Sequence, residues 1–573
     1  MLFESFRTMR REHGGEPAFL VAAGDRSIAI SWREFTDDIA AVSFGIREKC
    51  PGGVIALLGE NSYEWMVAHA ATVFSGAVVV PIDLNLSAEE IAARLTKTGA
   101  RVLVYSALHS EKAQKVKVLA PKTLVVGFGS EQSDDFISAA RKALGDDLPN
   151  IFDLEPPDVN RVSMIVFTSG TTSEPRGAEL TLAGLECFAA TAADRLSLAS
   201  RSRTLMLLPV FHIFGIAATY ASLAAGVALG VCPDYRRIYD AVVRFKADFL
   251  FLVPALADIL AAKIARQGNR AADIPGLALE WICTGGAPIS PLTHAKLRSL
   301  GIGMYAAYGL TETTASYSMS DMREETPCGS AGKVCTYLDT ETKVSQTGEL
   351  LIRGPGVFKG YYKDKSRTAQ AVDADGWFHT GDVGVIDENG LVSVKGRISR
   401  TIVLSSGKKI APEELENRIL MYPDVKEVLV YGDGESREIT AEVYTSAQDG
   451  EIHEAISVMN RSLPVYMRVK RVVVRREPFE RTASGKIALV QSKPRRRISF
   501  DWRSKLVAFS GFLALAVFLA DFVFDELLPS TMVEGGFFEE MRSCADVAGD
   551  VLIAAFAFSL LFKVWSVKRG RRR

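Results

Sequence analysis

The order of apolar and polar positions predicts alternating strands and helices over most of the chain. Short apolar runs that suit buried strands are separated by longer stretches with helical periodicity. A helix is expected over residues 62–74. Strands are expected at 54–58, 77–80 (closed by Pro81), 102–105, 123–126, 164–167 and 279–283. This alternation is typical of an α/β protein with mostly parallel sheets.

Beyond Gly348 the pattern changes to short strands punctuated by glycine. GELLIRGPGVFKGYY and GWFHTGDVGVIDENGLVSVKGR predict hairpins, one of them closed by a turn that carries the Asn389-Gly390 signature. A smaller α+β unit is expected after Arg397, with strands at 425–431 and 439–443. We therefore predict three parts, which span residues 1–396, 397–492 and 493–573.

Apolar residues are concentrated in the last part of the chain. Residues 506–524 form a run of about 19 residues that contains one acid, Asp521, and about 20 are needed to cross a bilayer. A second run, 547–567, is interrupted by Asp550 and Lys563. Basic clusters flank the pair and acidic residues dominate between them, which predicts a transmembrane helical hairpin with both ends in the cytosol. The alternative is a soluble hairpin that packs on the body or on a second subunit, because charges inside a span are costly.

The amino-acid composition argues against several classes of protein. The 573 residues include 67 Lys and Arg against 68 Asp and Glu, so no basic excess favours binding of nucleic acid. Hydrophobic residues at 48% and charged residues at 24% argue against a disordered chain. The seven cysteines are scattered without a C-x-x-C pair, which predicts buried cytosolic thiols. The N-terminus lacks the pattern of a cleaved secretory signal, so the catalytic region is expected in the cytosol.

The segment FTSGTTSEPRG, from Phe167 to Gly177, is the first candidate for chemistry. Small hydroxyl residues around a glycine allow backbone N–H and side-chain O–H groups to converge on phosphate oxygens, and Arg176 adds a positive charge. It is not a Walker A loop, because Ala178 follows Gly177 where Lys would be needed. Taken alone, the segment fits an ordinary surface loop equally well.

Further segments follow in an order that resembles the adenylate-forming superfamily: acyl-CoA synthetases, aryl-CoA ligases, luciferases and the adenylation domains of peptide synthetases. The matching segments are FTSGTTSEPRGAELT, PVFHIFG (209–215), TGGAPIS (284–290), YGLTETT (308–314), WFHTGDVG (377–384), GRISRTIVLSSGKKIAPEELE (396–416) and RTASGKI (481–487). The resemblance covers about residues 10–490. It implies a large N-terminal adenylate-forming domain with a β subdomain and a small, mobile α+β C-terminal domain.

The resemblance also implies a role for individual residues. Groups that bind the nucleotide would be Ser169, Gly170, Thr171, Thr172 and Arg176 at the triphosphate, Gly285, Gly286, Ala287, Tyr308, Gly309 and Thr311 at the adenine, and Asp382 with Arg397 at the ribose. The catalytic groups would be Lys486, Glu312, Thr168 and His212. Glu312 would bind Mg²⁺, Lys486 would bridge the carboxylate and the α-phosphate, and His212 would lie near the carboxylate.

Each of these residues has an ordinary explanation when it is considered singly. Asp382 fits a turn acid, His212 a core histidine, Glu312 an acid at a helix start, and Lys486 a solvated lysine. Only the ordered series of segments favours the functional assignment.

Four positions depart from the family pattern. Ser173 stands where the phosphate loop usually has Gly. Arg176 stands where the loop usually has Lys, which replaces a compact ammonium group with a planar guanidinium. Ala307 replaces a commoner Gly before Tyr308, and Ser399 occupies the hinge position, which is usually Asp or Lys. These departures bear on rate and substrate choice, because none removes a group that the chemistry requires.

The resemblance implies two half-reactions: a carboxylate attacks the α-phosphorus of ATP, and a thiol then attacks the acyl-adenylate and releases AMP. We expect a fatty-acid–CoA ligase that is anchored to the membrane by its tail, with Mg²⁺ as cofactor and its catalytic domains on the cytoplasmic side. The alternatives are transfer to a separate acyl carrier protein, an aryl or other acid as substrate, and a membrane-tethered binding module without catalysis. The oligomeric state stays open.

Overall fold

The computed structural model describes residues 1–129, 136–144, 151–153, 155–168, 175–404, 407–422, 424–432, 438–480 and 487. Contacts divide the chain into two units, Met1–Ala488 and Leu489–Arg573. The predicted membrane hairpin belongs to the second unit and lies outside the described residues. Among the helices that are described, none combines the length and the apolar character needed to cross a bilayer.

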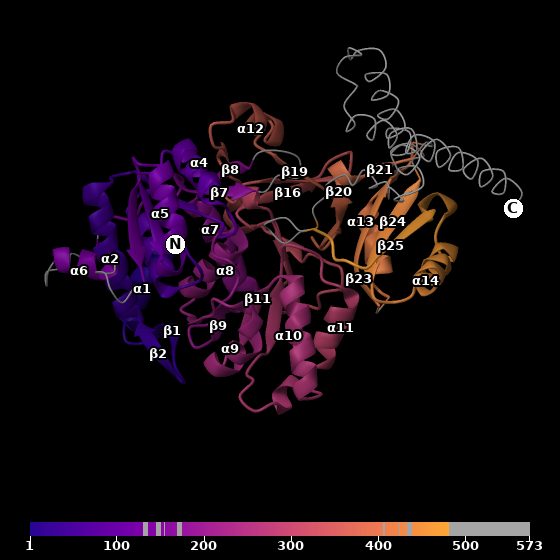
Figure 1. Ribbon diagram of the computed structural model, residues 1–573, viewed down its shortest axis with the longest axis horizontal. Coiled ribbons are helices and arrows are strands. Elements are labelled where there is room, and N and C mark those ends of the chain that lie inside the picture. The colour runs from indigo at the N-terminus through magenta and orange to yellow at the C-terminus, as the bar shows by residue number, and fades with distance from the viewer. Residues whose placement is uncertain are drawn as a thin grey trace, which may run out of the picture. The chain divides into compact units, whose positions relative to one another are not determined.

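A seven-stranded sheet in the order β18-β8-β7-β4-β3-β5-β6 forms the first layer of the N-terminal region (Figure 1). Its strands are β3 (Val54–Leu58), β4 (Val78–Pro81), β5 (Val102–Ser106), β6 (Leu124–Phe128), β7 (Val162–Thr168), β8 (Arg176–Thr181) and β18 (Gly360–Tyr361). The strands from β7 to β6 run parallel, whereas β8 is antiparallel to both of its neighbours, β7 and β18. The predicted strands are confirmed, but the sheet is mixed because the hairpin β7–β8 extends its edge.

Alternate residues of β3 face two different helical layers. Ile55 and Leu57 belong to the large core that includes α2 (Trp32–Lys49) and α3 (Tyr63–Phe74). Ala56 and Leu58 belong to a second cluster, with residues of α4 (Ala88–Thr98) and α5 (Ser110–Leu119). Both faces of the strand are therefore covered, which explains why its sequence is continuously apolar.

Two further mixed sheets complete the α/β body. One has the order β2-β1-β10-β9, and the other β11-β12-β13-β14-β15. Their strands are β1 (Pro17–Ala23), β2 (Arg26–Ser31), β9 (Arg203–Met206), β10 (Ala228–Val231), β11 (Phe249–Leu252), β12 (Trp281–Thr284), β13 (Gly303–Tyr308), β14 (Ser318–Met319) and β15 (Lys333–Val334). The remaining helices of the body are α1 (Leu2–His13), α6 (Phe136–Leu144), α7 (Leu182–Arg195), α8 (Ile213–Ala224), α9 (Ile238–Phe245), α10 (Pro254–Gln267) and α11 (Pro291–Ser299). As in the first sheet, most neighbouring strands are parallel, and antiparallel pairs lie at one edge, so the predicted mostly parallel sheets are mixed at their edges.

An antiparallel sheet follows, with the order β16-β17-β19-β20. Its strands are β16 (Glu341–Val344), β17 (Glu349–Arg353), β19 (Phe378–Ile386) and β20 (Val392–Arg397), and α12 (Lys365–Ala371) precedes β19. The predicted turn does join β19 to β20, through a bond from the Gly390 N–H to the Asp387 carbonyl. Gly390 has a φ of +78°, but Asn389 does not have a positive φ, so the turn is not the two-residue Asn-Gly type.

Residues beyond Arg397 build a small α+β region with a core of its own. It contains β21 (Ile402–Val403), β22 (Lys409–Ile410), α13 (Pro412–Ile419), β23 (Val425–Gly432), β24 (Ile439–Thr445), α14 (Asp449–Arg461) and β25 (Arg471–Arg475). Buried residues from Ile402 to Val469 form one hydrophobic cluster, separate from the large core. The strands predicted at 425–431 and 439–443 are confirmed, and the exact domain limits stay a prediction.

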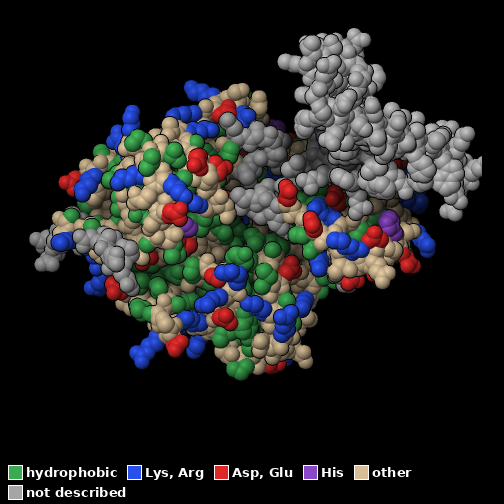
Figure 2. All heavy atoms as spheres, viewed as in Figure 1, with side chains coloured by type: hydrophobic (Ala, Val, Ile, Leu, Met, Phe, Trp, Pro, Cys, Tyr) green, Lys and Arg blue, Asp and Glu red, His purple; other side chains and the backbone are tan. Residues whose placement is uncertain are grey.

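The visible surface mixes charges of both signs, and hydrophobic side chains gather in its middle (Figure 2). This mixture agrees with a net charge of −1. Five of the described cysteines are buried as expected, but Cys328 is exposed, which corrects that prediction for this one thiol.

Candidate active site

Asp382 is held at the centre of a hydrogen-bonded chain. Its Oδ2 accepts a 2.6 Å bond from the Tyr308 hydroxyl, and its Oδ1 lies 2.8 Å from Nε of Arg397. The carboxylate side chain is only 5% exposed. Burial, and next the charge of Asp382, raises the pKa of Tyr308 well above its usual range, so the phenol stays a donor.

The local sequence explains how Asp382 reaches this position. In the β19–β20 ladder Asp382 lies directly opposite Arg397, so the ion pair follows from the strand register. Gly381 has a φ of +70°, which disfavours any side chain at that residue. The Thr380 hydroxyl accepts from the Asp382 N–H and donates to the Leu350 carbonyl. The segment Thr380-Gly381-Asp382 therefore holds the Asp382 carboxylate in place through the positive φ of Gly381 and the hydrogen bonds of Thr380.

The predicted adenine loop, residues 284–290, follows β12 and depends on its two glycines. A Cβ on Gly285 would lie 2.9 Å from the Phe214 ring and 3.2 Å from the Ala307 carbonyl oxygen. Gly286 has a φ of +80°. The first glycine is therefore required by a close approach and the second by its backbone conformation. Phe214 belongs to the PVFHIFG segment, so two of the predicted motifs touch here.

The segment after Tyr308 contains a strained turn. Thr314 and Ala315 follow one another with φ values of +49° and +61°, a conformation that non-glycine residues rarely adopt. A Cβ on Gly309 would lie 2.3 Å from the Ala315 backbone, so only glycine fits there. The Thr314 hydroxyl bonds to the Gly356 carbonyl at 3.0 Å. The fold thus accepts backbone strain immediately after Glu312.

Glu312 and Arg176 both interact with one residue that the sequence did not single out, Tyr361. The Tyr361 hydroxyl donates a 2.8 Å bond to Glu312 Oε1. The Arg176 guanidinium carbon lies 5.7 Å from the centre of the Tyr361 ring. Glu312 lies in the short 3₁₀ turn Thr311–Thr313, whereas Arg176 begins β8. Segments distant in sequence thus bring the acid Glu312 and the base Arg176 to the same tyrosine side chain.

The predicted phosphate loop connects β7 to β8. Thr168 is the last residue of β7 and lies opposite Arg176 in the ladder. Ser169, Gly170, Thr171, Thr172 and Ser173 lie outside the described residues, as does Lys486. The structure therefore places both ends of the loop and leaves the assignments of those residues as predictions.

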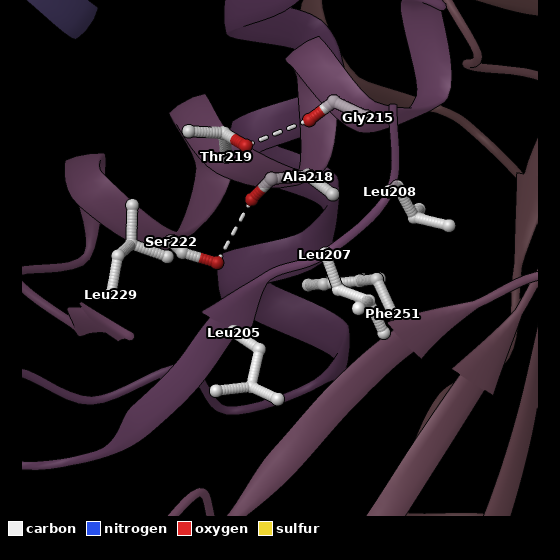
Figure 3. A pocket seen from close by; sticks show the side chains of 9 residues that line it. All are labelled: Leu205, Leu207, Leu208, Gly215, Ala218, Thr219, Ser222, Leu229 and Phe251. Atoms are coloured by element: carbon white, nitrogen blue, oxygen red, sulfur yellow. Dashed lines mark hydrogen bonds between the residues drawn. The ribbon is translucent and has the colours of Figure 1, made fainter. Parts of the chain in front are cut away.

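His212 occupies the N-cap position of α8 without a side-chain capping hydrogen bond, and its ring centroid lies 4.6 Å from that of Phe211. Behind this helix start lies a small pocket, lined by Leu205, Leu207, Leu208, Gly215, Ala218, Thr219, Ser222, Leu229 and Phe251 (Figure 3). The Thr219 and Ser222 hydroxyls donate to carbonyls of their own helix at 2.8 Å. These hydroxyls are satisfied within their own helix, and the pocket's volume of about 10 Å³ leaves room for roughly one water molecule.

The predicted hinge residue, Ser399, is exposed and lies in a 3₁₀ turn, Ile398–Arg400. On one side Arg397 pairs with Asp382, and on the other Arg400 pairs with Glu413 at 3.0 Å and Glu416 at 2.6 Å. Each flank of the turn is therefore tied to a different region of the chain.

Comparison with known proteins agrees with this geometry. Residues 6–362 match the AMP-binding enzyme family, and residues 399–492 match the AMP-binding enzyme C-terminal domain. The chain belongs to the AMP-binding enzyme family. As an AMP-binding enzyme it is of the AMP-forming acid–thiol ligase class that the motifs predicted.

Curated relatives of this AMP-binding enzyme act on different acids. The indoleacetate–CoA ligase of Aromatoleum aromaticum is 30% identical over 76% of this chain and 86% of its own length. The feruloyl-CoA synthase of an Amycolatopsis species is 28% identical over 82% and 94%. The long-chain-fatty-acid–CoA ligase FadD13 of Mycobacterium tuberculosis is 28% identical over 76% and 86%.

Solved structures show the same fold. The o-succinylbenzoate CoA synthetase of Bacillus subtilis, in complex with AMP, has a TM-score of 0.70 at 22% identity, covering 85% of this chain and 98% of that one. ATP-bound MatB of Rhodopseudomonas palustris has a TM-score of 0.72 at 22% identity, covering 85% and 97%.

Proposed function

We propose that this AMP-binding enzyme activates a medium- or long-chain fatty acid as an acyl-adenylate and then transfers it to CoA, with release of pyrophosphate and AMP. The observation that carries the proposal is the convergence of Tyr308, Asp382 and Arg397 in one bonded chain. Such a chain suits a ribose that bears two hydroxyls beside a planar base, because carboxylate oxygens accept from hydroxyls and an aromatic ring packs on a base.

The chemical problem of the first half-reaction is charge, since a carboxylate must approach a triphosphate. Arg176 at the end of the phosphate loop, together with the hydroxyls of Thr168 and its neighbours, would bind phosphate oxygens. Lys486 would place a positive charge between the carboxylate and the α-phosphate. None of these groups acts as a nucleophile, so the rate enhancement comes from positioning and electrostatics.

The residues present fit a magnesium ion that is shared with the nucleotide. Among the described residues, no three His, Cys, Asp or Glu side chains gather into a protein-only metal site. Glu312 supplies one carboxylate near Arg176, and Mg²⁺ is commonly held by one or two carboxylates plus substrate phosphates. When bound, the ion would neutralise charge on the phosphate oxygens.

The pocket beneath α8 is too small to accommodate an acyl chain, although leucines from β9, β10 and the segment after β9 form its walls with Phe251 (Figure 3). The choice of a fatty acid is supported by the name of one curated relative, a long-chain-fatty-acid–CoA ligase. The names of two other relatives favour a second candidate, an aryl acid.

One experiment separates these possibilities. Pyrophosphate release is measured with octanoate, palmitate, ferulate and indoleacetate, each with CoA or with holo acyl carrier protein. Release that is greatest with a fatty acid and CoA supports the proposal. Greater release with ferulate or indoleacetate supports an aryl acid, and turnover only with the carrier protein supports that thiol acceptor. If no acid releases pyrophosphate, the proposed activity is wrong.

We further propose that the tail anchors the enzyme to a membrane, with its catalytic domains on the cytoplasmic side. The argument rests on sequence alone: apolar runs at 506–524 and 547–567 between basic clusters. An amphiphilic acid partitions into bilayers, so an anchored enzyme would lie near its substrate.

A further inference from the structure

The backbone around Tyr361 is fixed on several sides. Tyr361 lies on β18, which pairs with β8 so that Tyr361 is opposite Ala178. Its N–H donates to the Thr368 hydroxyl at 2.9 Å, and its ring packs edge-on against Phe358, with 4.9 Å between the centroids. The residue is 9% exposed. Its ring therefore has a single defined position.

The Tyr361 hydroxyl donates a 2.8 Å hydrogen bond to Oε1 of Glu312. A hydrogen bond to an ionised carboxylate is stronger than one between neutral groups. The Glu312 backbone is held as well, because its carbonyl accepts from the Phe358 N–H at 2.8 Å. The bond to Oε1 thus sets the rotamer of the acid.

The ring of Tyr361 supports Arg176 in a different way. The guanidinium lies above the ring, and its Nε is buried without a hydrogen-bond partner in the described part of the chain. A buried donor without a partner is costly, which suggests a ligand that completes it. The aromatic ring stabilises the cation, and the Tyr361 hydroxyl also lies within hydrogen-bonding reach of the guanidinium, which leaves Nε for an incoming oxygen.

We propose that Tyr361 is a positioning residue that holds Glu312 and Arg176 in separate places for the metal–triphosphate complex. The inference rests on the proposed function, because it assigns Glu312 to Mg²⁺ and Arg176 to phosphate. Tyr361 contacts both an acid and a base through one side chain, and by holding each in its own place it restrains them from pairing with one another. The hydroxyl of Tyr361 orients the Glu312 carboxylate for Mg²⁺, and its ring supports the Arg176 guanidinium for phosphate.

The test separates these two sides by measuring ATP binding calorimetrically, with Mg²⁺ and with EDTA. Tyr361→Phe removes only the hydroxyl, so the gain in ATP affinity that Mg²⁺ provides should fall roughly tenfold, while affinity in EDTA should fall much less. Tyr361→Leu also removes the ring, so affinity in EDTA should fall as well. Tyr362→Phe is the matched control, because its hydroxyl donates only to the Thr98 carbonyl, at 3.1 Å.

A double-mutant cycle adds an independent criterion. In a Glu312→Gln background, the further change Tyr361→Phe should have little additional effect on the Mg²⁺-dependent gain, because both act on the same ligand. The inference is overturned if Tyr361→Phe keeps the wild-type gain, or if affinity falls equally with Mg²⁺ and with EDTA. If the wild-type protein binds no ATP under either condition, the proposed function fails instead.

Discussion

The Tyr308 hydroxyl and the Asp382 carboxylate, 74 residues apart in the chain, are joined by a partly buried 2.6 Å hydrogen bond. The bond connects the end of β13, which adjoins the predicted adenine loop, to β19 of the antiparallel sheet. The Arg397 guanidinium pairs with the other carboxylate oxygen of Asp382 at 2.8 Å. The orientation of the tyrosine ring and that of the acid are therefore set together.

Tyr308→Phe should raise KM for ATP roughly tenfold in ATP–pyrophosphate exchange and change kcat less, because the ring remains while the acid loses a donor. Tyr317→Phe is a suitable control: its ring lies 5.1 Å from that of Tyr308, but its hydroxyl donates to the Leu351 carbonyl. The control should lower thermal stability without moving KM. Equal KM values for wild type and Tyr308→Phe would show that the bond does not serve the nucleotide.

Lys486→Ala should abolish adenylation far more than it slows thiol capture of a supplied acyl-adenylate. Loss of one preorganised charge at a transition state typically costs ~10²–10³ in rate. The two half-reactions are measured separately, by pyrophosphate release and by thioester formation from the synthetic adenylate. Lys486→Arg keeps the charge and should retain more adenylation than Ala. Losses of the same size in both half-reactions would assign Lys486 a structural role.

Much of the α/β body could be predicted from the sequence, because a parallel strand that is covered on both faces must be continuously apolar. The run Val54–Leu58 illustrates this, since its alternate side chains enter two different clusters. The mixed character of the sheets could not be predicted, because pairing partners such as β8 and β18 lie far apart in the chain. Local periodicity carries no information about such neighbours.

The residues of the candidate site were likewise predicted only in part from the sequence. Motifs predicted Asp382, Arg397, Glu312 and Arg176, but not Tyr361, because its role depends on contacts to residues from two other segments of the chain. The GYY sequence at 360–362 was a weak signal, since it predicts only a strand beside a glycine. Thr314 and Ala315 gave no signal of positive φ, since neither residue type favours it.

Ser399→Pro should leave adenylation largely intact and block thioester formation. Proline fixes φ near about −65°, which the observed 3₁₀ turn accepts, but it prevents rotation to a second conformation. Arg397 and Arg400 keep their own ion pairs on either side, so the rotation would be confined to this short turn. Ser399→Gly serves as the control that preserves rotation. Wild-type turnover of the proline variant would place the hinge elsewhere or exclude a rotation.

Truncation after Arg497 should release the protein from membranes and preserve adenylation of short, water-soluble acids. Every residue assigned to ATP, Mg²⁺ and the acid precedes 490, whereas the apolar runs lie wholly beyond 504. Burial of apolar surface at about 25 cal/mol per Å² favours insertion of 506–524, and the cost of Asp521 offsets part of it.

The full-length protein should therefore resist extraction by high salt, which screens the Arg and Lys clusters, and should yield only to detergent. Fractionation of membranes followed by immunodetection measures this directly, and the truncated chain is the matched control. Release of the full-length protein by salt would indicate a tail held at the surface by charge. A truncated protein that is soluble but inactive on every acid would indicate that the tail packs on the catalytic body, and the membrane hairpin would have to be abandoned.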